Sequence, residues 1–455
     1  MILSYPSSNV LFIFFLLLVH YGVLFFLVLN EIYDIIIKKA EGENMFIDIN
    51  IPSEVETALN ILNKNGFEAF IVGGCVRDSL LGSAPNDWDI TTSAKPDEIS
   101  MCFNKYRTIN TGLKHGTVTV IINKMQLEIT TYRIDGKYSD NRRPDNVLFT
   151  DDLSNDLKRR DFTINSLAYN KIGIVDLFGG IEDINNKLIK CVGNPDERFS
   201  EDGLRILRAL RFASKLSFGI DNHTSISIHK NKNLLKNISK ERISAELNKL
   251  IIGAKFHDII MEYRDVIEVF IPEVISYNTR EWENIICSMK YTADLVIRLA
   301  LMLYKTDAEI VLRNLKYDGA TIKRVKSIIL YKDEEIKPDK IKLKKQLNII
   351  GHDNFIDLLK FQIAFNMADK NINEKKIDDL KDSEKVLKDI VLNNECYNLK
   401  MLAIDGKDLK KEGISKGITL GSILNEILKL VIEERLENKY EVLIDYVRKY
   451  IKNKI

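Results

Sequence analysis

Apolar and polar positions recur with different periods along this 455-residue chain, and the periods predict a mixed head followed by helices. From about residue 45 to 180, short apolar runs such as Ala69–Val72, typical of buried strands, alternate with stretches of helical spacing. Beyond that region the spacing is helical, as in Glu201–Leu216, where Ile206 and Leu210 fall on one side. The predicted fold class is therefore α+β, with an α/β head and all-helical parts after it.

Changes in composition and spacing divide the chain into five parts. They are an apolar N-terminal segment, a head, a neck, a body and a tail, at residues 1–44, 45–180, 181–250, 251–345 and 346–455. The body has long apolar helix faces, and the tail is densely charged with both signs mixed. No internal repeat is present, so a repeat architecture is not expected.

The first 44 residues do not fit an ordinary enzyme head, because Val10–Leu29 is an apolar run long enough to span a bilayer. Lys38 and Lys39 follow it, as at the cytoplasmic end of an anchor. We favour another interpretation, in which Met45 is the true start and AT-rich DNA read upstream of it yields Phe, Leu and Ile. A membrane anchor is the alternative, and contact with a membrane is expected only in that case.

Charge and cysteine content narrow the class of protein. The chain has 66 Lys plus Arg against 65 Asp plus Glu, a formal net charge of +1, so nucleic-acid binding needs local basic patches. The 5 cysteines are far apart and form no Cys-X-X-Cys or Cys/His pattern. A disulfide framework or zinc site is therefore not expected, and a cytoplasmic location is the simple interpretation.

One short stretch carries the most informative chemistry. Gly73 and Gly74 follow the apolar run and let a backbone approach phosphate oxygens closely. Arg77 lies on the helix expected to begin there. Asp87 and Asp89, spaced as on one face of a strand, supply the carboxylates that Mg²⁺ takes together with phosphate and water. A phosphate cradle beside such a metal site predicts nucleotidyl transfer.

Further motifs follow in a fixed order. In chain order the set is Gly73-Gly74, Asp87-X-Asp89, Glu128, Arg159-Arg160-Asp161 and Glu201-Asp202-X-X-Arg205. This order resembles the class II tRNA nucleotidyltransferases, which are the CCA-adding enzymes, and their poly(A) polymerase relatives. The resemblance implies a head of the polymerase-β nucleotidyltransferase type, with Mg²⁺ as cofactor.

The resemblance implies catalytic roles for the carboxylates. Asp87 and Asp89 would hold two Mg²⁺ ions, which lower the pKa of the primer 3′-hydroxyl and steady the leaving pyrophosphate. Glu128 would be a third ligand or the carboxylate that polarises the 3′-hydroxyl. Gly73 and Gly74 would offer backbone N–H groups to the triphosphate.

Four more residues of the head are expected to bind the nucleotide. Arg77 and Arg160 would contact phosphate, Arg160 in fork geometry. Asp161 would accept hydrogen bonds from ribose hydroxyls, and Asn165, one helical turn on, would assist it. A local ion pair at the start of a helix is the alternative for Arg160 and Asp161.

Asp202 and Arg205 lie three apart on the predicted helix, so we expect their side chains to be neighbours. An ordinary ion pair is one interpretation, and a base-reading edge is the other. The carboxylate only accepts and the guanidinium only donates. Cytosine and adenine offer an amino donor beside a ring acceptor, whereas uracil and guanine would leave buried groups unpaired at a cost of about 1–3 kcal/mol. The pair can therefore admit CTP and ATP and reject UTP and GTP without a template.

Three basic or mobile features complete the expected substrate site. Arg208 and Arg211 repeat the spacing of three and, unless they form only a solvated face, offer a basic surface to the base and triphosphate. The loop Arg133–Asp145 resembles the family's flexible loop, which helps the pocket change from C to A addition. Ile404–Leu409 and the glycines after it resemble a tRNA-gripping part of bacterial members. Its lysines, expected to make salt-sensitive phosphate contacts, are Lys407, Lys410, Lys411 and Lys416.

The sequence thus predicts a template-independent tRNA nucleotidyltransferase that adds CCA to the tRNA 3′ end from CTP and ATP and releases pyrophosphate. An A-adding or CC-adding enzyme and a poly(A) polymerase are the alternatives within the family. A catalytically dead, membrane-tethered RNA-binding protein is the alternative of another class, and the complete carboxylate set argues against it. The expected partner is tRNA, with no protein partner.

Overall fold

The computed structural model has two compact units, Met1–Glu201 and Asp202–Ile455, and each is described by itself. The structure describes residues 49–110, 112–113, 116–136, 147–369, 373–414 and 418–452. The expectations for residues 1–44, for most of the predicted flexible loop and for Lys416 lie outside the described residues.

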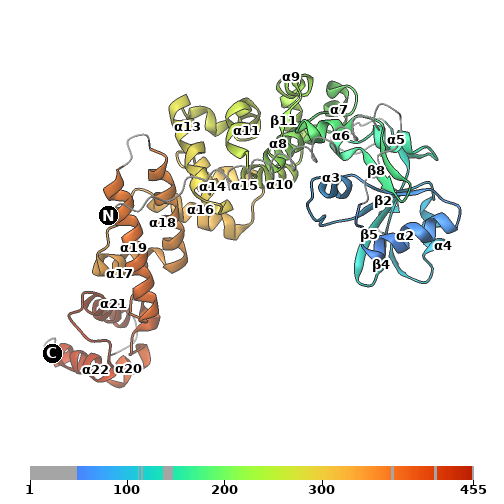
Figure 1. Cartoon of the computed structure of the whole chain (residues 1–455). Coiled ribbons are helices and arrows are strands. Elements are labelled where there is room, and N and C mark those ends of the chain that lie inside the picture. Colours follow the sequence, from blue (N-terminus) through green and yellow to red (C-terminus); the bar gives the residue numbers. More distant parts are fainter. Residues whose placement is uncertain are drawn as a thin grey trace, which may run out of the picture. The chain divides into compact units, whose positions relative to one another are not determined.

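The first unit is built on a seven-stranded sheet with strand order β3-β4-β5-β2-β1-β8-β9 (Figure 1). The strands are β1 (Ala69–Val72), β2 (Asp89–Thr92), β3 (Arg107–Ile109), β4 (Thr117–Ile122), β5 (Met125–Thr131), β8 (Leu167–Asn170) and β9 (Gly173–Asp176). β2 pairs with β5 in parallel, and the other neighbouring strands pair antiparallel. The parallel pair is the important one, because its register sets Asp89 beside Glu128.

Local sequence explains the centre of this unit. β1 is the predicted apolar run, and all its residues are buried. Residues of β4 alternate between buried and half-buried, as expected of a strand with one face toward a core. The helices of the first unit are α2 (Ser53–Lys64), α3 (Gly74–Leu80), α4 (Pro96–Cys102), α5 (Leu153–Lys158), α6 (Gly180–Asn185), α7 (Pro195–Glu201) and the 3₁₀ helix η2 (Thr163–Asn165). The remaining strands are the hairpin of β6 (Arg133–Asp135) with β7 (Val147–Phe149), and β10 (Leu188–Ile189).

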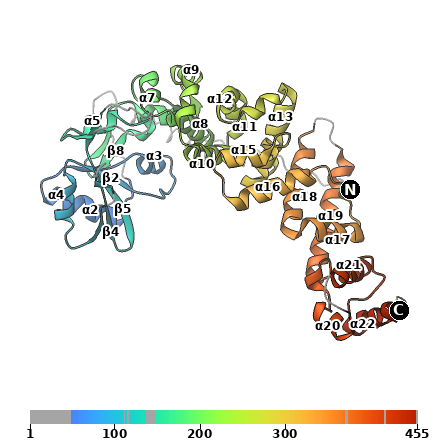
Figure 2. The same ribbon diagram turned by 180° about the vertical axis from the view of Figure 1, so that it is seen from behind.

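The second unit is almost entirely helical (Figures 1 and 2). Its α-helices are α8 (Leu204–Leu216), α9 (Asn222–Asn231), α10 (Lys240–Ile251), α11 (Phe256–Glu262), α12 (Arg264–Phe270), α13 (Thr279–Ser288), α14 (Leu295–Met302), α15 (Ala308–Asn314), α16 (Gly319–Tyr331), α17 (Lys340–Ile350), α18 (His352–Met367), α19 (Glu374–Leu392), α20 (Gly406–Lys411), α21 (Ile418–Ile432) and α22 (Tyr440–Lys452). The short elements are β11 (Gly219–Ile220), η3 (Lys232–Asn237), η4 (Pro272–Ser276), η5 (Met289–Tyr291) and η6 (Leu399–Met401). One apolar core joins α17, α18 and α19, and another joins α20, α21 and α22. The predicted α+β class is confirmed.

The start of the first long helix in this unit differs from the sequence expectation. We expected one helix over Glu201–Leu216, but α7 ends at Glu201 and α8 begins at Leu204. The Asp202 carboxylate accepts a hydrogen bond from the Leu204 backbone N–H at 3.0 Å, and aspartates bonded in this way favour helix starts over helix interiors. Asp202 therefore precedes the helix that carries Arg205.

The sequence also predicted how the chain divides and the state of its cysteines. The chain divides after Glu201, inside the predicted neck, and the finer division into neck, body and tail stays a prediction. All 5 cysteines are free thiols, as their spacing indicated. Across the ranges that the structure describes, no helix is long and apolar enough to cross a membrane.

Candidate active site

The turn between β1 and α3 is the predicted glycine turn. Gly73 has a φ of 82°, in the region that favours glycine, and a Cβ there would lie 3.1 Å from Arg160 Nη1. The turn thus brings backbone and guanidinium together, as a phosphate cradle requires. One expectation is corrected, because the Gly73 N–H already donates to Leu167 O of β8 at 3.0 Å and is not offered to a ligand.

Gly73→Ala is expected to lower both stability and nucleotide addition. The positive φ costs roughly 1–3 kcal/mol for a residue with a side chain, and the new methyl group displaces Arg160. Gly82→Ala is the matched control, because Gly82 also has a positive φ of 70° but nothing within 4 Å of its Cβ position. Thermal midpoints should fall in both variants, and activity only in Gly73→Ala. Equal loss of activity in the two would contradict the role of this turn.

Two of the three predicted carboxylates, Asp89 and Glu128, line one pocket of the first unit. Asp89 on β2 and Glu128 on β5 are register partners of the parallel pair, and both are solvent-exposed. Asp87 comes just before β2 and is also exposed, while Trp88 between them is buried. A pocket of about 200 Å³ lies here, lined by Val72, Asp89, Ile90, Thr117, Glu128, Thr130, Arg133, Arg159 and Arg160.

Electrostatics at Asp89 fit a cation site. The pKa of Asp89 is raised above its usual range, first because the walls of the pocket withdraw its carboxyl group in part from water, and then by the negative charges of Glu128 and Asp87, against the opposing charge of Arg160. A bound cation would relieve this crowding of hard oxygen donors, which are the ligands of Mg²⁺. Within the described part of the chain, no group of three or more His, Cys, Asp or Glu residues is arranged to hold an ion. Both predicted roles of Glu128, as a third ligand or as the carboxylate beside the 3′-hydroxyl, stay predictions.

Asp161 and Asn165 come together as predicted. Asn165 Nδ2 donates to Asp161 Oδ1 at 3.1 Å, and the Phe162 N–H donates to the same oxygen at 2.9 Å. Arg77 Nη1 donates to Asn165 Oδ1, and Arg77 Nη2 forms an ion pair with Asp78 at 2.6 Å. Arg77 is buried and held by these partners, so its position fits support of Asn165 better than the predicted direct phosphate contact.

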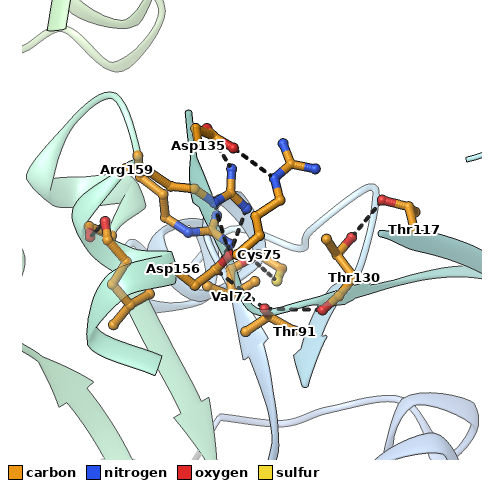
Figure 3. A network of polar contacts seen from close by, with 12 residues as sticks. Val72, Cys75, Thr91, Thr117, Thr130, Asp135, Asp156 and Arg159 are labelled. Carbon is orange, nitrogen blue, oxygen red and sulfur yellow. Dashed lines mark hydrogen bonds and ion pairs between the residues drawn. The ribbon is translucent and has the colours of Figure 1, made fainter. Parts of the chain in front are cut away.

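Two arginines that line the pocket, Arg159 and Arg160, are hydrogen-bonded to the buried carboxylate of Asp156 (Figure 3). Arg160 Nη2 bonds to Asp156 Oδ2 at 3.1 Å, and Arg159 Nη2 bonds to Asp156 Oδ1 at 2.7 Å. Arg160 does form a local ion pair, although it lies after the end of α5 and not at a helix start, so both interpretations of Arg160 stay open. Sequence reasoning missed Asp156, and it named Arg133 and Arg159 only as parts of the loop and of a motif, without a role in the pocket. The one available signal was the spacing of Asp156, three and four residues before the two arginines.

The predicted base-reading residues belong to the second unit. Asp202 Oδ2 forms an ion pair with Arg242 Nη2 of α10 at 2.7 Å. Arg205 is buried on the first turn of α8. The Asp202 carboxylate is thus anchored by a neighbouring helix, and Arg242 was missed because nothing in its local sequence marks it.

The predicted basic surface on α8 needs correction. Arg211 is buried rather than fanned outward, and its Nε lies 2.6 Å from Glu246 Oε2 of α10. The guanidiniums of Arg208 and Arg211 both lie over the Phe212 ring, at 5.4 and 3.7 Å from its centroid. Because Arg211 is buried and paired with Glu246, it links α8 to α10 within this unit.

The lysines of the predicted tRNA contact lie on a short exposed helix. Lys407, Lys410 and Lys411 all belong to α20 and are exposed. Lys411 forms an ion pair with Asp408 at 3.1 Å. Their position fits a surface that meets a polyanion, and their role in binding RNA stays a prediction.

Comparisons with known proteins agree with this fold. Residues 69–190 match the family described as Poly A polymerase head domain. Residues 217–277 match one described as Probable RNA and SrmB- binding site of polymerase A, and residues 290–447 match one described as tRNA nucleotidyltransferase domain 2 putative. The three matches follow one another along the chain, from the head to near its last helix.

Two curated relatives are CCA-adding enzymes of lactic acid bacteria and their kin. The enzyme of Ligilactobacillus salivarius is 49% identical over 220 residues, which cover 48% of this chain and 54% of the relative. The enzyme of Enterococcus faecalis is 50% identical over 207 residues, which cover 45% of this chain and 50% of the relative. The chain thus spans about half the length of the curated relatives that it matches.

Solved structures extend the similarity to most of the chain. The Bacillus stearothermophilus CCA-adding enzyme in complex with CTP superposes with a TM-score of 0.75 at 29% identity, covering 88% of this chain and 98% of that one. The Thermotoga maritima CCA-adding enzyme complexed with tRNA, at a TM-score of 0.59 and 20% identity over 89% of this chain and 97% of that one, shows the same fold. A mixed α/β head followed by helices is therefore an architecture that this chain shares with these structures. Over most of its described length the chain is thus similar to tRNA nucleotidyltransferases and to poly(A) polymerases.

Proposed function

We propose that this chain is a tRNA nucleotidyltransferase that adds C, C and A to the 3′ end of tRNA from CTP and ATP, with release of pyrophosphate. The observation that carries the proposal is the pairing of Asp89 and Glu128 across two parallel strands, in a pocket walled by Arg133, Arg159 and Arg160. Carboxylates facing guanidiniums across a small pocket suit a reaction that joins a hydroxyl to a triphosphate. The relatives named as CCA-adding enzymes agree with it.

Divalent metal ions are general in this family, and we propose Mg²⁺ here. Asp87 and Asp89 would hold it, since both are exposed carboxylates on either side of a buried tryptophan. When bound, Mg²⁺ would lower the pKa of the primer 3′-hydroxyl and neutralise charge on the phosphates. Glu128, on the adjacent strand, would accept a hydrogen bond from that hydroxyl and orient it.

The nucleotide's phosphates and ribose would meet the other side of the pocket. Arg160 Nε is buried without a hydrogen-bond partner, and its Nη1 lies against Gly73, so the guanidinium keeps donors for a phosphate oxygen. Gly73 allows that approach because it has no side chain. Asp161, steadied by Asn165, would accept from the ribose hydroxyls.

Base selection is proposed for Asp202 and Arg205 of the second unit. Arg242 holds Asp202 from α10, which fixes the carboxylate as a hydrogen-bond acceptor rather than leaving it to rotate. An acceptor beside the Arg205 donor suits the amino and ring-nitrogen edge of cytosine or adenine. The partner macromolecule would be tRNA, with phosphate contacts from Lys407, Lys410 and Lys411.

A poly(A) polymerase is the second candidate. Two of the matched families, over residues 69–190 and 217–277, are described by reference to poly(A) polymerase or polymerase A. The chemistry of a single addition is the same in both candidates, and they differ in primer and in when addition stops.

The first experiment asks whether the chain transfers nucleotides at all. The purified full chain is incubated with tRNA ending at the discriminator base, labelled CTP and Mg²⁺, and pyrophosphate release is followed with label incorporation. We expect equal amounts of both, abolished by a chelator and restored by Mg²⁺. Absence of both would overturn the proposal, and dependence on ATP with any RNA primer would favour the poly(A) polymerase.

A further inference from the structure

One buried carboxylate of the first unit joins the pocket wall to the strand that carries Asp89. Asp156 on α5 has no exposed surface, and both of its oxygens are engaged (Figure 3). Oδ1 accepts from Arg159 Nε at 3.0 Å and Nη2 at 2.7 Å. Oδ2 accepts from Arg160 Nη2 at 3.1 Å and from Thr91 Oγ1 at 3.3 Å. Four donors from three residues thus converge on a single side chain.

The arrangement is costly unless every partner is in place. An ionised carboxylate without exposed surface is stable only when it is paired and hydrogen-bonded. Burial by itself would raise the pKa of Asp156, yet that pKa is lowered because the charges and hydrogen bonds of Arg160 and Arg159 outweigh burial. Conversely, the adjacent guanidiniums of Arg159 and Arg160 would repel each other without this shared anion. Asp156, Arg159 and Arg160 therefore hold one another in position.

The paired arginines still present donors to the pocket. Arg159 and Arg160 both line it, and their side chains keep 18% and 19% of their surface exposed. Arg160 uses Nη2 for Asp156, while its Nη1 lies next to Gly73. Asp156 thus holds both guanidiniums at one side, while Arg159 Nη1 also lies 3.7 Å from Asp135 Oδ2 and Arg160 Nη1 lies beside the glycine turn.

The same carboxylate is tied to the catalytic strand. Thr91 lies two residues after Asp89 on β2, and its Oγ1 bonds both Asp156 and Thr130 O of β5. Strand residues two apart share a face, so the side of β2 that presents Asp89 is the side that meets Asp156. Asp156, which contacts both Thr91 and the two arginines, therefore helps to set the distance between the Asp89 carboxylate and these arginines.

We propose that Asp156 is a positioning residue for nucleotide binding. It places Arg159 and Arg160 to receive the oxygens of a nucleoside triphosphate or of pyrophosphate, and it touches neither substrate itself. The proposal rests on the proposed function, because it names the residue that arranges the phosphate side of that same pocket. A merely structural ion pair would affect stability alone, whereas this role affects anion affinity through Arg160.

Equilibrium binding tests the proposal without depending on turnover. The affinities of the full chain for CTP and for inorganic pyrophosphate, each with Mg²⁺, are measured by calorimetry for the parent chain and Asp156→Asn. Asparagine keeps the volume but loses the charge, and its amide would donate toward a guanidinium. We expect both affinities to fall about 10-fold or more, a loss of about 1.4 kcal/mol or more. The KM for CTP should rise in parallel while kcat changes less than about 3-fold.

A double-mutant cycle separates positioning from general damage. In an Arg160→Ala background, Asp156→Asn should weaken CTP binding much less than it does alone, because both changes remove the same contact. Asp357→Asn is the matched control, since Asp357 is a buried aspartate with two bonds to Arg324 in the second unit. It should lower the thermal midpoint and leave both affinities unchanged.

Each outcome of these measurements supports or overturns the role of Asp156. Unchanged affinities in a folded Asp156→Asn chain, or full additivity with Arg160→Ala, would overturn the proposal. If Asp156→Asn does not fold, Asp156→Ser, which also removes the charge, replaces it, and unchanged affinities in that variant would equally overturn the proposal. A parent chain that binds CTP but adds no nucleotide would refute the proposed function. The comparison of binding affinities between the parent chain and Asp156→Asn would still test the role of Asp156. A parent chain that binds neither ligand would refute both.

Discussion

Replacing Asp89 by asparagine is expected to lower the rate of nucleotide addition about 1,000-fold or more while the fold is kept. Asp89 faces the pocket beside Glu128, and its carboxylate is the proposed ligand for Mg²⁺. An uncharged amide weakens that ligand and removes one of the negative charges that crowd the site. A loss of this size corresponds to about 4 kcal/mol of transition-state stabilisation. Single-turnover addition of CTP to tRNA measures it directly.

Two controls make the Asp89 result interpretable. Asp97→Asn changes an exposed aspartate on α4 of the same unit and should leave the rate unchanged. The thermal midpoint of Asp89→Asn should equal or exceed that of the parent chain, because the change relieves repulsion among carboxylates. A folded Asp89→Asn chain that retains a tenth of the parent rate would remove Asp89 from the chemistry.

Asp202→Ala is expected to relax base selection by about 100-fold. The parent chain should favour CTP over UTP because a uracil edge leaves the Asp202 acceptor and the Arg205 donor without partners. Removing the acceptor deletes that penalty for UTP and the matching bond for CTP. The ratio of kcat/KM for CTP to that for UTP should therefore collapse, mainly through loss of CTP use. All four nucleoside triphosphates are compared on one tRNA primer.

The matched control for Asp202 is another aspartate at a helix start. Asp202, just before α8, accepts a hydrogen bond from the N–H of its first residue, Leu204, and Asp221 caps α9 through the Thr224 N–H at 3.1 Å. Each loss of a cap costs about 0.5–2 kcal/mol of stability. Asp221→Ala should show that cost with unchanged selectivity. Equal decline of all four nucleotides in Asp202→Ala would mean that Asp202 supports the helix and does not read the base.

Sequence reasoning succeeded where short-range patterns determine structure. The buried strand β1, the glycine turn at Gly73 and the contact of Asn165 with Asp161 all depend on residues close in sequence. The α+β class followed from the change of period along the chain. That Asp89 and Glu128 meet in a parallel pair was expected only in the general sense of neighbouring strands, because the register depends on the whole sheet.

Sequence reasoning failed where side chains are fixed by distant partners. Arg77 and Arg211 were expected to face a ligand, yet they are buried against Asn165 and Glu246 respectively. Helical spacing suggested that Asp202 and Arg205 share one helix, but a side-chain hydrogen bond to the backbone begins the helix after Asp202. Such contacts depend on packing between elements, which local periodicity does not encode.

The product of addition tests the central claim most directly. The full chain with Mg²⁺ and tRNA ending at the discriminator base is given CTP alone, ATP alone or both, and products are resolved to single nucleotides. The account predicts two additions with CTP alone, none with ATP alone, and three with both, after which growth stops. Growth of a long A tail would instead identify a poly(A) polymerase. Addition of A only to a primer already ending in CC, or a halt after CC with both nucleotides, would contradict the complete CCA reaction.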